Sequence, residues 1–103
     1  MRVVALVPDL MDRSKVAAAC PGAVFVAGAG ALPAAAAGAD LVVLDLSRPG
    51  VLDALPALVA TGVRVVGFGS HVDTPTLDAA AASGAEVLVR SRFFGRISEI
   101  VAP

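Results

Sequence analysis

The sequence has no tryptophan or tyrosine and a single cysteine, Cys20. Only four residues are aromatic, so the core must be built from Val, Leu and Ala. One cysteine excludes an internal disulfide, and this one is most simply a small hydrophobic side chain at a helix end. The apolar runs are broken well before the roughly 18 residues that span a bilayer, and no signal-peptide pattern is found. We therefore expect a cytoplasmic protein without a membrane segment.

An excess of charge of one sign is also missing. The formal net charge of −1 argues against binding to nucleic acid, which normally requires a basic stripe. At 103 residues the chain is long enough for one hydrophobic core, and we expect a single domain over residues 1–103. Its function must therefore come from one site or one surface.

The sequence does contain five short apolar segments with the character of strands. They cover residues 2–7, 23–27, 41–45, 63–68 and 86–89. The third is an unbroken apolar run that ends at Asp45, which is typical of a central strand covered by helices on both faces. Segments with helical spacing or composition alternate with the strands, at residues 11–20, 31–37, 51–61, 75–83 and 93–101.

This alternation predicts a parallel sheet with right-handed crossovers and helices on both faces. We expect an α/β, flavodoxin-like (βα)5 three-layer sandwich whose parallel five-stranded sheet has the order 2-1-3-4-5. Two helix starts are also predicted. Asp9, three residues before Asp12, is expected to cap the first helix, and Thr74 before Pro75 is expected to cap the fourth.

In this topology, polar residues that follow the strands converge on one edge of the sheet. These residues are Asp9, Asp45, Ser70, His71 and Arg90. The carboxylates of Asp9 and Asp45 are candidate ligands for Mg²⁺, which prefers oxygen donors. Ser70, His71 and Arg90 are candidates for binding a phosphoryl group or another anion. The simpler alternatives are that Asp9 is a helix cap and that His71 is a surface residue.

The run Asp-Leu-Val-Val-Leu-Asp-Leu-Ser-Arg-Pro-Gly resembles the third strand and following loop of the two-component response-regulator receiver domain, the CheY-like family. Asp45 matches the aspartate that accepts a phosphoryl group, and Pro49 matches the proline that usually follows four residues later. The resemblance extends over the whole chain in length and element order. It includes a Gly-Ala pair before the fifth strand and Phe93 after it. It implies a role in bacterial signal transduction.

The sequence departs from the receiver pattern at three places. Pro8 stands where the first of two acidic residues is usual, with Asp9 at the second. Gly69 takes the place of a Thr or Ser, with Ser70 one residue late, and Arg90 replaces a Lys. Loss of a carboxylate weakens Mg²⁺ binding, and loss of the hydroxyl means that no side chain is drawn toward a phosphoryl oxygen. Arginine is also a poor substitute for lysine, because it is longer and planar.

We therefore favour a stand-alone degenerate receiver, or pseudo-receiver, that acts as a protein-interaction module and is not an enzyme. The alternative is a phosphorylatable single-domain response regulator with Asp45 as phosphoacceptor and Mg²⁺ as its weakly bound metal. A third possibility is a small anion-binding or hydrolase-like protein that uses Asp45, Ser70, His71 and Arg90. The sequence lacks the Gly-x-Ser-x-Gly motif of many hydrolases.

A candidate partner surface lies near the C-terminus, at Arg92, Phe93, Phe94 and Arg96. Arginine and aromatic residues are enriched at protein interfaces. Two adjacent phenylalanines cannot both face the same way, so we expect one ring in the core and the other at the surface. The receiver resemblance implies that the fourth strand, fifth strand and last helix contact a signalling protein, a histidine kinase or a second copy of the chain.

Overall fold

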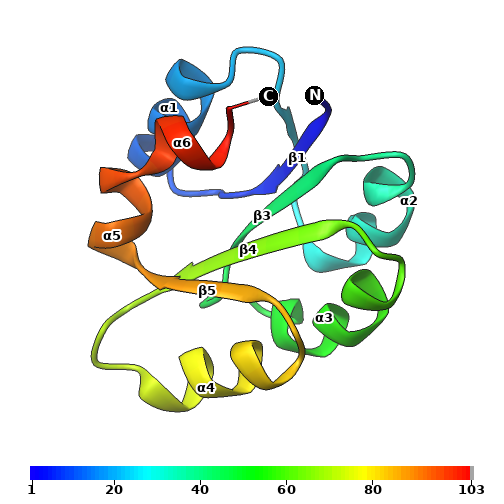
Figure 1. Cartoon of the computed structure of the whole chain (residues 1–103), viewed down its shortest axis with the longest axis vertical. Coiled ribbons are helices and arrows are strands. Elements are labelled where there is room, and N and C mark those ends of the chain that lie inside the picture. Colours follow the sequence, from blue (N-terminus) through cyan, green and yellow to red (C-terminus); the bar gives the residue numbers. More distant parts are fainter. Residues whose placement is uncertain (103) are drawn as a thin grey trace.

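The computed structural model describes residues 1–102. Its strands form one parallel sheet in the order β2-β1-β3-β4-β5 (Figure 1). The strands are β1 (Val3–Leu6), β2 (Val24–Phe25), β3 (Leu41–Asp45), β4 (Arg64–Gly69) and β5 (Glu86–Val89). The predicted flavodoxin-like topology and strand order are confirmed.

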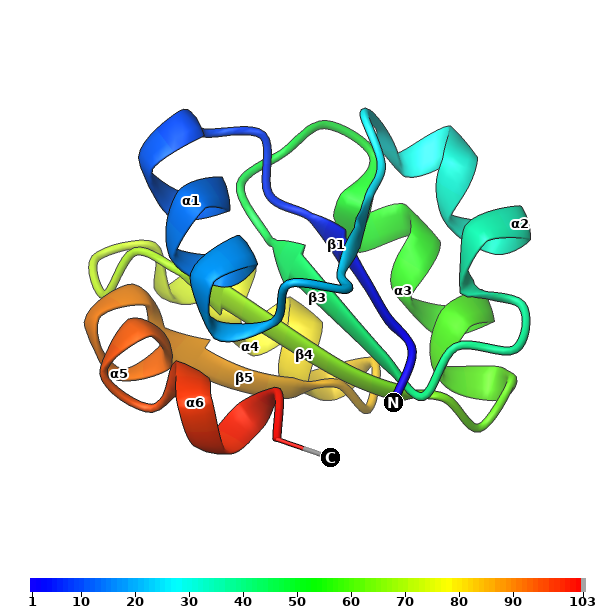
Figure 2. The same ribbon diagram turned by 90° about the horizontal axis from the view of Figure 1, so that it is seen from above.

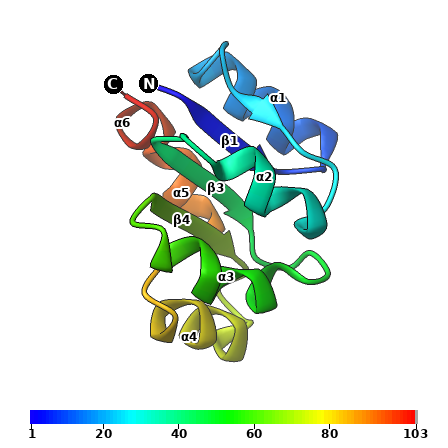
Figure 3. The same ribbon diagram turned by 90° about the vertical axis from the view of Figure 1, so that its right-hand side faces the viewer.

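Helices cover both faces of the sheet and give three layers. They are α1 (Leu10–Ala19), α2 (Leu32–Ala36), α3 (Val51–Ala60), α4 (Thr74–Ala82), α5 (Arg90–Gly95) and α6 (Ile97–Ile100), with a 3₁₀ turn, η1 (Ala29–Ala31), before α2. One face is covered by α1, α5 and α6 (Figure 2). The other is covered by α2, α3 and α4, which lie in front of the sheet in Figure 3. No helix within residues 1–102 is long and apolar enough to cross a bilayer.

The central strand β3 is buried along its whole length, as its unbroken apolar run predicts. Alternate side chains point to opposite faces of a strand, so β3 contributes to both cores. Val42 and Leu44 pack in the core under α2, α3 and α4. Leu41 and Val43 pack in the core under α1, α5 and α6. This arrangement places Asp45 at the carboxyl end of a fully buried strand.

The two predicted helix caps have different outcomes. The carboxylate of Asp9 accepts a hydrogen bond of 3.0 Å from the backbone N–H of Asp12, which confirms Asp9 as the N-cap of α1. The cap of α4 is Asp73, which accepts a hydrogen bond from the N–H of Thr76, so the assignment to Thr74 is wrong. The helix begins one residue earlier than expected because Pro75 fits within its first turn, where an N–H is not required.

The last part of the chain also differs from the prediction. Residues 90–92 were expected to form a loop before one helix over residues 93–101. Instead α5 begins at Arg90, directly after β5, and ends at Gly95. The backbone of Arg96 leaves the helical region at φ −119°, and α6 follows as a separate short helix. Glycine is a weak helix former, which favours the break at this point.

Candidate functional site

Asp45 is surrounded by residues of its own loop. It is 7% exposed, and its Oδ1 accepts hydrogen bonds from the backbone N–H of Ser47 at 3.0 Å and from the Ser47 hydroxyl at 2.7 Å. Its Oδ2 accepts a hydrogen bond of 3.1 Å from Nε of Arg48. Both carboxylate oxygens are therefore engaged, and an arginine three residues away neutralises the charge.

Asp45 lines a small cavity at the carboxyl edge of the sheet, with a volume of about 150 Å³. Its other lining residues are Ser47, Phe68, Gly69, Ser70 and Arg90. The cavity thus brings together Asp45, Ser70 and Arg90, three of the residues that the sequence predicted to converge. The hydroxyl oxygen of Ser70 accepts a hydrogen bond from the N–H of Val72, so it also takes part in its own loop.

Two predicted site residues do not line this cavity. His71 is exposed in the loop after β4 and does not line the cavity around Asp45. Asp9 is exposed at the start of α1 and does not line it either. The hydrogen bond from the N–H of Asp12 lowers the pKa of Asp9, and the nearby Arg90 and Arg48 lower it further. The cap role of Asp9 accounts for its position.

Asp12 is the site residue that the sequence reasoning missed. Its side chain is 1% exposed, and both of its carboxylate oxygens accept hydrogen bonds from the terminal nitrogens of Arg90. These hydrogen bonds raise the pKa of Arg90, whose side chain is about half exposed. The sequence does carry a signal, because Asp12 lies four residues before Val16 and so shares the core-facing side of α1. An acidic residue on that side requires a cationic partner.

Aromatic rings surround the pair of Asp12 and Arg90. The Cζ of Arg90 lies 5.1 Å from the ring centroid of Phe94, and Nζ of Lys15 lies 5.0 Å from the same centroid. The rings of Phe68 and Phe93 meet edge to face at 4.7 Å, in the core beneath. Cation–π contacts and the bidentate ion pair together fix the start of α5 against α1.

The predicted metal site has a poor set of donors. Within residues 1–102, no three side chains of His, Cys, Asp or Glu lie close enough together to hold a metal ion. The two proposed ligands also have other partners, since Asp9 caps α1 and Asp45 binds Ser47 and Arg48. A hard cation such as Mg²⁺ needs about six oxygen ligands and would have to displace Arg48.

The four residues of the predicted partner surface do not share one environment. Phe93 is fully buried in the core, so its assignment to a partner surface is wrong. It lies on the side of α5 that packs against the sheet, because the helix begins earlier than expected. Phe94 is partly buried between Arg90 and Lys15. Arg92 and Arg96 are exposed.

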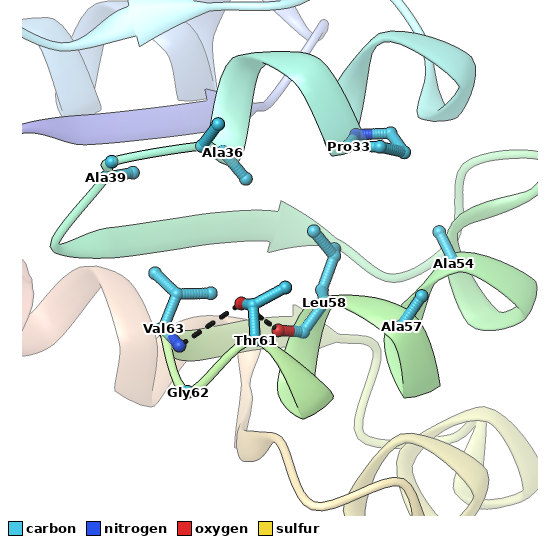
Figure 4. A pocket seen from close by; sticks show the side chains of 11 residues that line it. Pro33, Ala36, Ala39, Ala54, Ala57, Leu58, Thr61, Gly62 and Val63 are labelled. Atoms are coloured by element: carbon cyan, nitrogen blue, oxygen red, sulfur yellow. Dashed lines mark hydrogen bonds between the residues drawn. The ribbon is translucent and has the colours of Figure 1, made fainter.

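A second, larger hollow lies away from these residues, between α2 and α3 (Figure 4). It has a volume of about 530 Å³ and is lined mostly by alanine and glycine, together with Pro33, Leu58, Thr61 and Val63. The hydroxyl of Thr61 donates to the carbonyl of Leu58 and accepts from the N–H of Val63. Its one polar side chain is therefore already paired, and the hollow shares no lining residue with the cavity at Asp45.

The comparisons with known proteins identify the fold. The phosphorylated cyanobacterial phytochrome response regulator RcpA superimposes with a TM-score of 0.80 at 14% identity, over 96% of this chain and 89% of that chain. The Mn²⁺-bound form of the response regulator Rcp1 gives a TM-score of 0.77 at 12% identity, over 96% and 90%. The signal receiver domain of NarL from Mycobacterium tuberculosis gives 0.74 at 23% identity, over 97% and 91%.

The fold is that of a receiver domain. No family model and no curated protein matches the chain by sequence. The receiver fold thus extends over nearly the whole chain, at identities of 12% to 23% in these three comparisons. In this receiver fold, Asp45 ends the central strand and Arg90 follows the last strand, as the sequence resemblance implied.

Proposed function

We propose that this chain is a degenerate receiver domain that acts as a protein-interaction module in signal transduction. On this proposal, phosphorylation of Asp45 is not its input. The observation that carries the proposal is the bidentate ion pair of Arg90 with the buried Asp12, which commits the arginine that directly follows β5 to a partner on α1. Pairing of Asp45 with Ser47 and Arg48 supports it further.

The missing hydroxyl at the end of β4 supports the same proposal. Gly69 is buried, and a Cβ there would lie 3.1 Å from Cδ2 of Leu77. A larger side chain at this position would have to displace Leu77. Ser70 is exposed and its hydroxyl oxygen accepts a hydrogen bond within the loop. Few side chains are therefore free to form hydrogen bonds with a phosphoryl group on Asp45.

The test is an amide NMR titration with Mg²⁺ followed by beryllofluoride, which mimics a phosphoryl group on an aspartate. Asp45→Ala is the control, because it removes the acceptor. We expect no shift at millimolar Mg²⁺ that depends on Asp45, and none on adding beryllofluoride. Shifts that spread from Asp45 to Ser70 and Arg90 and vanish in the control would contradict the proposal. They would support the alternative of a phosphorylatable receiver.

For the interaction itself, we propose the face formed by β4, β5 and the helices that follow β5. Arg92 and Arg96 are exposed on this part of the chain and could bind acidic groups of a signalling protein or a second copy. Charge reversal by Arg92→Glu and Arg96→Glu should weaken partner binding or self-association, as measured by light scattering and affinity capture. Arg13→Glu is a matched control, because Arg13 is exposed on α1 and lies over the ring of Phe25 in β2, at the opposite edge of the sheet. An equal effect of this control would count against the proposed face.

A further inference from the structure

Arg90 has three acidic residues around it and pairs with one of them. Asp12, Asp9 and Asp45 all raise the pKa of Arg90, and Asp12 has the largest effect. Asp45 and Arg90 even line the same cavity of about 150 Å³. In spite of this, within residues 1–102 the guanidinium donates its hydrogen bonds to Asp12.

Burial explains why Asp12 holds the guanidinium. The Asp12 side chain is 1% exposed, so its charge cannot be solvated by water and depends on a cationic partner. Asp45 has Ser47 and Arg48 as partners and does not depend on Arg90. The ring of Phe94, 5.1 Å from the Cζ of Arg90, further favours the orientation toward α1.

We propose that Asp12 sequesters Arg90 from Asp45, so that the start of α5 does not respond to a change of charge at the end of β3. Asp12 is thus an insulating residue within the receiver fold. Removal of its charge would free the guanidinium to turn into the shared cavity and pair with Asp45. The inference goes beyond the proposed function, because it concerns where Arg90 is held and does not depend on whether Asp45 can be phosphorylated.

Side-chain NMR of the arginine Nε–H groups tests this directly. In the wild-type background, Asp45→Asn should shift the Nε signal of Arg48, whose partner it removes, and leave that of Arg90 in place. In an Asp12→Asn background, the same Asp45→Asn change should shift the Arg90 signal and the backbone amides at the start of α5. A shift of Arg90 as large as that of Arg48 in the wild-type background would overturn the proposal.

A double-mutant cycle measures the same competition as an equilibrium. Arg90→Gln crossed with Asp12→Asn should show a coupling of roughly tenfold in the unfolding equilibrium constant, whereas Arg90→Gln crossed with Asp45→Asn should show less than about twofold. In the Asp12→Asn background the second coupling should increase. No increase there would overturn the proposal.

The proposal can also be tested without a substitution at Asp12 or Arg90. If Asp12→Asn or Arg90→Gln fails to fold, the Nε–H spectrum of the single variant Asp45→Asn still tests the proposal. An unchanged Arg90 signal together with a shifted Arg48 signal supports sequestration. A moved Arg90 signal overturns it. Failure of the proposed function would appear in a different measurement, as beryllofluoride shifts that depend on Asp45 in the unmodified chain.

Discussion

The side chain of Leu46 occupies the space above Gly67, where a Cβ would lie 2.5 Å from Cδ2 of Leu46. Leu46 follows β3 and is 2% exposed, in the core under α2, α3 and α4. The neighbouring Gly69 similarly leaves room for Leu77. The two glycines of β4 therefore serve the packing of leucines against the strand.

Gly67→Ala should destabilise the protein by about 1–3 kcal/mol, because Leu46 must shift within a packed core. Urea unfolding would measure the change. Gly95→Ala is the matched control, since no atom lies within 4 Å of a Cβ there, and it should stay within about 1 kcal/mol of wild type. Equal stability of the two variants would contradict this account of β4.

Arg90→Met should destabilise the protein by about 3 kcal/mol, because it leaves the carboxylate of Asp12 buried without its partner. Arg92→Met changes an exposed arginine two residues away and should cost less than about 0.5 kcal/mol. Chemical denaturation of both variants makes the comparison. A small effect of Arg90→Met would mean that water reaches Asp12.

Phe93→Ala should cost about 3–5 kcal/mol, as expected for a fully buried ring. Phe94→Ala should cost less, because Phe94 is only partly buried. Thermal and urea unfolding would rank the two variants. The reverse order would place Phe94 in the core and return Phe93 to the surface.

The ion pair of Arg64 and Glu86 predicts a dependence of stability on pH. The hydrogen bonds from Arg64 hold the pKa of Glu86 below its ordinary value. The unfolded chain therefore takes up this proton at a higher pH than the folded protein does. The stabilisation is fully present above the unfolded pKa and is lost as the pH falls through the folded pKa.

Glu86→Gln should remove this part of the pH dependence. Both side chains are about half exposed, so the effect should stay below about 1 kcal/mol. Urea unfolding of wild type and variant at pH 6 should show the difference, and the gap should narrow as the pH falls through the folded pKa of Glu86. A constant gap across this range would mean that Glu86 stabilises the protein through packing.

The parts of the structure that depend on local pattern could be predicted from the sequence. The buried run that ends at Asp45 identified the central strand, and strand and helix alternation gave the topology. The cap at Asp9 followed from residue types three positions apart. The cap at Asp73 was missed because Thr74 and Pro75 offered a competing local signal.

The central contact of the site could not be predicted in the same way. Asp12 and Arg90 lie 78 positions apart, and the local sequence around either residue does not predict the contact between them. The sequence also could not show which of Phe93 and Phe94 is buried. A surface and a core position were expected, but which ring is buried depends on where α5 begins, and that residue is Arg90.

The two edges of the sheet are unequal and both are short. At one edge β2 pairs over two residues, Val24 and Phe25. At the other, β5 has four residues, and its first, Glu86, carries a charge held by Arg64. An extended peptide that joined either edge would gain few backbone hydrogen bonds, so aggregation by strand addition is disfavoured. A partner would therefore have to bind mainly to side chains and not to exposed strand backbone.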